Sequence, residues 1–246
     1  MSKAETVKRI QEIGIIPAIR VASAEDAHFA AETVASAGIP IVEITMTVPE
    51  AVKLISHLVH HHPDMIVGAG TVLSTDVAAL CSDAGACFLT SPGLNQKMVE
   101  SAAKQGIAVL PGAMTPTEVI AAWEGGADLV KVYPCEALGG EKYIKALRTA
   151  LPQIPLIAAG GVKQQTASGF ILAGASAIGV GTELIPADAI ANRETERIQE
   201  LARRFLTAVS DARQRLAPAK GRAKATKTDF LKLDKPETEK SRERSK

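Results

Sequence analysis

The feature that most constrains the fold is a repeat, in which a short apolar run, a turn and an alanine-rich amphipathic segment follow one another eight times. The apolar runs, which we predict to be strands, are residues 15–21, 40–47, 66–72, 87–92, 108–114, 129–134, 155–161 and 177–184. Strands that alternate with helices of this length predict right-handed βαβ units, whose parallel sheet is buried on both faces.

The segments between the strands carry the signals of helix boundaries. The helices predicted there include residues 24–37, 49–61, 95–105 and 140–151. Several begin with a capping residue or with a proline at the first helical position, as at Ser23, Pro49 and Thr115.

Eight units in about 200 residues predict one α/β domain over residues 1–216, a closed (β/α)8 (TIM) barrel. An open, doubly wound sheet is the competing architecture. The first strand lacks the GxGxxG turn typical of that fold, however, and eight evenly spaced units favour closure. Residues 3–13 predict an extra helix ahead of the first strand, and we expect it to cover the floor of the barrel.

Charge is unevenly distributed along a chain whose formal net charge is only +1. Residues 217–246 hold ten Lys/Arg and five Asp/Glu, which leaves residues 1–216 with a net charge of −4. We expect residues 217–246 to form a disordered basic tail, because their few apolar side chains cannot offset the entropy cost of ordering. A weakly acidic body lacks the basic surface that nucleic acid requires, so no nucleic-acid partner is expected.

Other classes of protein are disfavoured by the rest of the sequence. No apolar run approaches the roughly 18 residues of a membrane-spanning helix, and the first residues form a charged amphipathic segment rather than a signal peptide. The three cysteines have no CxxC spacing, so neither a disulfide framework nor a structural zinc site is indicated. These features lead us to expect a cytoplasmic protein with no membrane partner.

Two charged residues fall on predicted strands, whose carboxyl ends carry the chemistry of barrel enzymes. Because side chains alternate along a barrel strand, Glu43, Thr45 and Thr47 share one face, which we predict to point inward. Lys131 lies between two valines and is likewise predicted to lie on a single face, away from the surface.

A buried ion pair between Lys131 and Glu43 that only holds the barrel together is one explanation. Apolar replacements of such pairs are often neutral or stabilising, so stability alone explains the pair poorly. Burial also disfavours the charged form of an amine, which makes a buried lysine available as a neutral nucleophile. We therefore interpret Lys131 as a nucleophile.

Glycine-rich turns end the last two predicted strands. Gly160 and Gly161 follow one strand, and Gly181 and Thr182 follow the next. In barrels these two loops are the usual phosphate site, because missing side chains let backbone N–H groups approach the anion. The turns therefore predict a phosphorylated small-molecule ligand without specifying a reaction.

The histidines argue against a catalytic metal. All five, His28, His57, His60, His61 and His62, map to predicted helices or to a helix end. A metal-dependent aldolase or isomerase would normally place imidazole ligands at strand ends. We therefore predict no metal and no other cofactor. Metal binding at the surface is the alternative explanation of the run of histidines, which we interpret as a solvated helix end.

The order and spacing of several motifs are those of a known family. They are VEITMT, VGAGTV, TSPGL, VLPGAMTPTE, VKVYP, GGV and GVGTELIP. From about residue 5 to residue 213 the chain resembles the KDPG/KHG aldolase family. Its members are class I lyases that cleave 2-keto-3-deoxy-6-phosphogluconate (KDPG) or 4-hydroxy-2-oxoglutarate (KHG).

The resemblance assigns roles residue by residue. It implies that Lys131 forms the Schiff base and that Glu43 is the general acid/base. Thr71 and Pro92 match positions around the pyruvyl part of the substrate. The phosphate cradle matches Gly160, Gly161, Gly181 and Thr182. The family also implies a homotrimer, and with the 6-phosphogluconate-derived substrate it implies a place in the Entner–Doudoroff pathway.

The chain departs from the common family pattern at two positions, which puts substrate preference in doubt. Thr47 replaces an arginine that helps to hold the substrate carboxylate, and Ala159 replaces a threonine. Arg20, at the end of the first predicted strand, resembles an arginine of members that lack the other one, and it is a candidate anchor for carboxylate or phosphate.

Three alternatives remain open. The first is a different aldolase substrate, KHG or 2-dehydro-3-deoxy-6-phosphogalactonate. The second is a phosphate-binding barrel isomerase or epimerase that needs no covalent lysine. The third is a non-enzymatic role carried by the basic tail, which predicts full function without Lys131.

Overall fold

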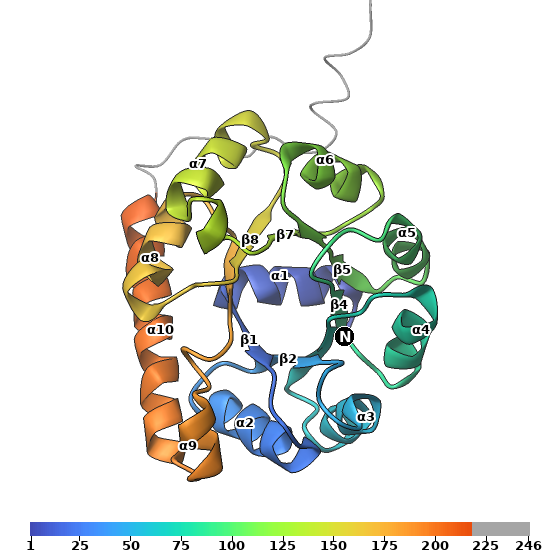
Figure 1. Cartoon of the computed structure of the whole chain (residues 1–246), viewed down its shortest axis with the longest axis vertical. Helices are drawn as coiled ribbons and strands as arrows, with labels where there is room; N and C mark the ends of the chain where they lie inside the picture. Colours follow the sequence, from blue (N-terminus) through green and yellow to red (C-terminus); the bar gives the residue numbers. More distant parts are fainter. Residues whose placement is uncertain (218–246) are drawn as a thin grey trace, which may run out of the picture.

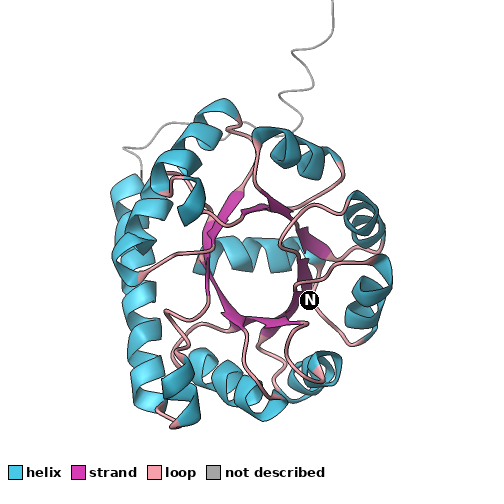
Figure 2. Ribbon diagram, in the orientation of Figure 1, coloured by secondary structure: helices cyan, strands magenta, loops and turns pink. Residues whose placement is uncertain are grey.

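A computed structural model describes residues 1–217 of the chain, so nearly all of the predicted tail lies outside the described residues. Figures 1 and 2 show a ring of strands inside a ring of helices, the (β/α)8 barrel that the repeat predicts. Among the described residues no helix is both long and apolar enough to span a membrane.

The ring consists of parallel strands in the order β5-β4-β3-β2-β1-β9-β8-β7-β6. Their bounds are β1 Ile15–Ile19, β2 Ile41–Thr45, β3 Ile66–Gly70, β4 Phe88–Thr90, β5 Ala108–Leu110, β6 Gly112–Ala113, β7 Val130–Val132, β8 Leu156–Ala159 and β9 Ala177–Val180. Each lies within a predicted strand. The predicted strand 108–114 is divided into β5 and β6 at Pro111, which has no N–H to donate to a ladder. β5 pairs with β4 and β6 pairs with β7.

Helices follow the strands and form the outer layer. Their bounds are α1 Lys3–Ile13, α2 Ala24–Ser36, α3 Ala51–His61, α4 Thr75–Asp83, α5 Gln96–Lys104, α6 Pro116–Glu124, α7 Glu141–Ala150, α8 Gln164–Leu172, α9 Ala187–Ala191 and α10 Thr195–Leu216, with a short 3-10 helix η1 at Glu136–Leu138. Ser23 and Thr115 cap α2 and α6 as predicted. The predicted start at Pro49 is wrong: α3 begins at Ala51, because Glu50 before it adopts a left-handed conformation with φ 55°.

The extra helix α1 crosses the ring in Figure 1 and closes the floor of the barrel, as predicted. Ile10 of α1 is fully buried against an apolar cluster inside the ring. The cluster also contains Ile16, Ile41, Ile66, Phe88, Ala108, Leu110, Leu129, Ile157 and Ala177. A second, larger apolar core lies between the strands and the helices. The end of the barrel interior that α1 covers is therefore a packed apolar core.

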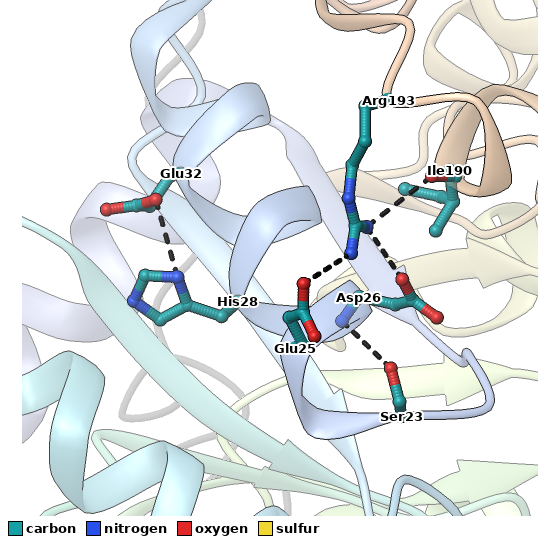
Figure 3. Close-up of polar contacts among 7 residues, drawn as sticks. All are labelled: Ser23, Glu25, Asp26, His28, Glu32, Ile190 and Arg193. Carbon is teal, nitrogen blue, oxygen red and sulfur yellow. Dashed lines mark hydrogen bonds and ion pairs between the residues drawn. The ribbon is translucent and has the colours of Figure 1, made fainter.

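Polar contacts tie the last helices to the start of α2. Arg193, between α9 and α10, donates to Glu25 at 3.0 Å and to Asp26 at 2.6 Å (Figure 3). Ser23 accepts from the backbone N–H of Asp26, which fixes the first turn of α2. These exposed ion pairs contribute only modestly to stability. The packing of α10 along α8 and α2 supplies the apolar burial.

Candidate active site

Glu43 and Lys131 meet inside the barrel, on the side opposite α1. Glu43 lies on β2 and Lys131 on β7, and Lys131 Nζ is 3.5 Å from Glu43 Oε2. The side chain of Glu43 is only 4% exposed and that of Lys131 only 12%. The strand alternation that predicted inward faces for both residues therefore brings them together, although β2 and β7 are not neighbours in the sheet.

Gly70 makes room for the Glu43 carboxylate. Glu43 and Gly68 are register partners on β2 and β3, and Gly70 is the next inward position of β3. A Cβ at Gly70 would lie 2.1 Å from Glu43 Oε1. From the VGAGTV motif only Thr71 was predicted to belong to the site, and this role of Gly70 was not predicted. A glycine on the same face as a predicted buried carboxylate is the signal that could have identified it.

A cavity of about 310 Å³ lies above the pair and is lined from the ends of β1, β2, β7, β8 and β9. Tyr133 contributes one wall, and Lys131 Nζ lies 5.7 Å from the centroid of its ring. Of the predicted site residues, those that line the cavity are Arg20, Glu43, Lys131, Gly160, Gly161, Gly181 and Thr182. The barrel thus gathers residues from five strand ends into one site.

Thr47, Thr71 and Pro92 do not line this cavity. β2 ends at Thr45, so Thr47 lies beyond the strand and is exposed, in contrast to its predicted inward face. The hydroxyls of Thr45 and Thr47 are 2.8 Å apart, and that of Thr45 donates to the Ile19 carbonyl at 3.0 Å.

Thr71 and Pro92 lie at the ends of neighbouring strands. Thr71 has φ 59° and accepts a hydrogen bond from Arg20 Nη2 at 3.2 Å. The carbonyl of Pro92 would lie 2.2 Å from a Cβ at Gly112, so this turn packs directly on the start of β6. The contact with Thr71 holds Arg20 at the cavity edge, and the substrate-binding roles of Thr47, Thr71 and Pro92 stay predictions.

The glycine turn after β8 carries a cation that the sequence analysis missed. Gly160 and Gly161 have φ of 84° and 86°, which side chains rarely adopt. Lys163, two residues later, also lines the cavity and forms an ion pair with Glu136 at 3.5 Å. A lysine two residues after the glycine pair was the available signal. Arg20, Lys131 and Lys163 together give the cavity three cationic side chains.

Cys135 is fully buried behind the cavity, among the apolar side chains of the outer core. Burial raises the pKa of its thiol to about 12, so the thiol is neutral at physiological pH. The group therefore fills space and is not a second nucleophile.

Fold and site together define a class of protein. A closed parallel barrel that gathers a buried amine, a carboxylate and glycine turns at the carboxyl ends of its strands has the organisation of a TIM-barrel enzyme. Residues 6–201 match the model of the KDPG and KHG aldolase family. The chain belongs to this family and is a carbon–carbon lyase.

Individual relatives agree with the family assignment. The KHG/KDPG aldolase of Escherichia coli (strain K12) is 33% identical over 190 residues, which cover 77% of this chain and 89% of that protein. The 2-dehydro-3-deoxy-6-phosphogalactonate aldolase of the same strain is 31% identical over 205 residues, covering 82% of this chain and 98% of that protein.

A solved structure adds a chemical observation on a related protein. KDPG aldolase from Legionella pneumophila, with pyruvate captured as a covalent carbinolamine intermediate, superposes with a TM-score of 0.75 and 29% identity. The match covers 80% of this chain and 96% of that structure.

Proposed function

We propose that this chain is a class I aldolase that cleaves 2-dehydro-3-deoxy-6-phosphogluconate to pyruvate and glyceraldehyde 3-phosphate through a Schiff base on Lys131. The observation that carries the proposal is the 3.5 Å separation of Lys131 Nζ and Glu43 Oε2, two little-exposed side chains that line the same cavity. A nucleophile beside a proton-transfer group is the arrangement that covalent catalysis requires.

The first half of the reaction forms the covalent intermediate. The Lys131 ammonium passes a proton to the Glu43 carboxylate, and the resulting neutral amine attacks the C2 ketone. A proton then moves from the newly bonded nitrogen to the alkoxide to give a carbinolamine. Glu43 is positioned to protonate the departing hydroxyl, so that water leaves and an iminium forms. The burial of both groups limits competing exchange with solvent.

The second half breaks the carbon–carbon bond. The Glu43 carboxylate takes the proton of the C4 hydroxyl, the C3–C4 bonding electrons move toward the iminium, and the aldehyde departs. The remaining enamine is protonated at C3, and water hydrolyses the iminium to release pyruvate and the free lysine. General acid–base help of this kind typically contributes about 10² to 10⁴ in rate.

The phosphate of the substrate belongs at the glycine turns. Gly160, Gly161 and Gly181 leave the backbone accessible at the ends of β8 and β9. An anion at this turn would attract Lys163, which is paired with Glu136. Arg20 can hold the carboxylate or the phosphate, because β1 lies between β2 and β9 in the ring.

A second candidate substrate is 2-dehydro-3-deoxy-6-phosphogalactonate. The observation that favours it is the similarity to a phosphogalactonate aldolase, which is 31% identical over 98% of that protein. The family resemblance adds that Thr47 stands where many members carry an arginine. KHG is a third candidate substrate of the same chemistry.

The remaining parts of the proposal rest on the sequence and on the family. They are the tail boundary at residue 217, the homotrimer, the cytoplasmic location and the role in the Entner–Doudoroff pathway.

The test is kcat/KM for pyruvate release from both phosphorylated epimers, their unphosphorylated forms and KHG. A phosphorylated epimer as best substrate supports the proposal, and the preferred epimer decides between the first two candidates. Rearrangement of a phosphorylated sugar without pyruvate release would instead indicate the isomerase or epimerase alternative.

A further inference from the structure

Four of the five histidines gather around one carboxylate in the outer helix layer. His28 and Glu32 lie on α2, His57 and His61 on α3, and His62 directly after α3. The rings of His28 and His57 lie 5.2 Å apart, and those of His57 and His61 stack at 4.1 Å. Within the described residues, none of these side chains lines the cavity above Glu43 and Lys131, which we call the mouth cavity.

Glu32 lies between two of these imidazoles. His28 Nδ1 is 3.4 Å from Glu32 Oε2, and His62 Nε2 is 3.4 Å from Glu32 Oε1. Figure 3 shows His28 and Glu32 facing each other on α2, where an i, i+4 spacing places them on one face. The three ligand atoms lie within 4.8 Å of one another.

The three groups lie close enough together to surround a small tetrahedral cation. Zinc bonds to nitrogen and oxygen ligands are about 2.0–2.2 Å long, so neighbouring ligands in a tetrahedron lie about 3.3–3.6 Å apart. Each of the two imidazole nitrogens lies 3.4 Å from its own oxygen of the Glu32 carboxylate, and the side chains of His28 and His62 are 32% and 31% exposed. The group is therefore packed enough to be ordered and open enough to admit an ion.

We propose that His28, Glu32 and His62 bind one divalent transition-metal ion, with zinc as the probe of choice, and that water completes the coordination. The two imidazole donors suit zinc, nickel and copper better than the hard cations magnesium and calcium, and zinc also accepts a carboxylate ligand. Because two ligands belong to α2 and one follows α3, the ion would link neighbouring helices and stabilise the folded chain by mass action.

The experiment uses the untagged full-length chain, freed of metal with a chelator and dialysed against Zn²⁺ alone. We expect one zinc per chain and a rise in the thermal midpoint on binding. His62→Ala and Glu32→Gln should each weaken zinc affinity about 100-fold or more, because loss of a mere outer-shell partner already costs 10–100-fold. Circular dichroism confirms that each variant is folded.

His60→Ala is the matched control. His60 belongs to the same histidine run, but its Nδ1 faces the Ser56 carbonyl at 2.7 Å and it is not part of the three-residue group. It should change zinc affinity less than twofold. The proposal is overturned if zinc does not bind stoichiometrically, if Glu32→Gln leaves affinity unchanged, or if His60→Ala weakens binding as much as His62→Ala. Aldolase activity is not the readout, so either proposal can fail without the other.

Discussion

The two ends of the barrel interior are built from the same strands and have opposite chemistry. On β2, Ile41 packs in the floor cluster, and Glu43, two residues further, lines the mouth cavity. The pattern repeats at β7, where Leu129, directly before the strand, lies in the floor and Lys131 lines the mouth cavity. Since a step of two residues keeps a side chain on the same face, one strand supplies both a packed layer and a reactive one.

Side-chain size also separates the two ends. At the floor, the Phe88 ring fills the space beside Gly68, where a Cβ would lie only 2.3 Å from the ring. At the mouth, Gly70 makes room for the Glu43 carboxylate, and the small residues Ala159 and Gly179 line the cavity. The packed floor therefore stabilises the barrel, whereas the mouth is less densely packed and holds the candidate site. Mutations at the two ends should accordingly have different effects.

The largest expected effect on activity is at Glu43. Glu43→Gln keeps the size of the side chain and removes its capacity to accept a proton, so kcat should fall by about 10² to 10⁴ with the fold retained. Glu183→Gln, which changes another carboxylate of the cavity, should have a much smaller effect. A Glu43→Gln enzyme with near-normal steady-state kcat would contradict the assigned role.

Mutations in the floor cluster should change the stability of the protein rather than its activity. Phe88→Ala removes a fully buried ring beside a glycine that cannot fill the gap, so the free energy of unfolding should fall by about 3–5 kcal/mol. Phe88→Leu should cost less than about 1.5 kcal/mol. Urea unfolding measures both, and kcat per folded molecule should stay within about twofold. A large loss of kcat with unchanged stability would break the distinction between the two ends.

Arg20 tests the edge of the mouth with a smaller effect. A charged hydrogen bond contributes about 1.5–3 kcal/mol, so Arg20→Ala should lower kcat/KM by roughly 10- to 150-fold. Equal losses on substrates with and without phosphate indicate a carboxylate contact, and a loss confined to phosphorylated substrates indicates a phosphate contact. Arg197→Ala, on α10, is the exposed control. A change below twofold on every substrate would make Arg20 structural.

Much of the fold and the central pair could be predicted because both depend on local periodicity. The strand–helix repeat gave the barrel, and the two-residue alternation placed Lys131 and Glu43 inside it. The predicted start of α3 at Pro49 was wrong because Glu50 adopts a left-handed conformation that the Val48-Pro49 pattern does not indicate.

Contacts between distant segments could not be predicted in this way. Arg20 meets Thr71 across 51 residues, and Lys163 pairs with Glu136 only because the loops after β7 and β8 lie side by side. The room that Gly70 leaves for the Glu43 carboxylate likewise depends on the register between β2 and β3. Such positions require the assembled barrel.

The most direct test of the account is reductive trapping of the covalent intermediate. Borohydride added with pyruvate should reduce the iminium and attach one adduct per chain, which peptide mass spectrometry should place on the peptide containing Val130-Lys131-Val132. Lys131→Met should abolish the adduct, whereas Lys163→Met, which removes another lysine of the cavity, should retain it. An adduct that persists in Lys131→Met, or that maps to another lysine in the native enzyme, would contradict the central role of Lys131.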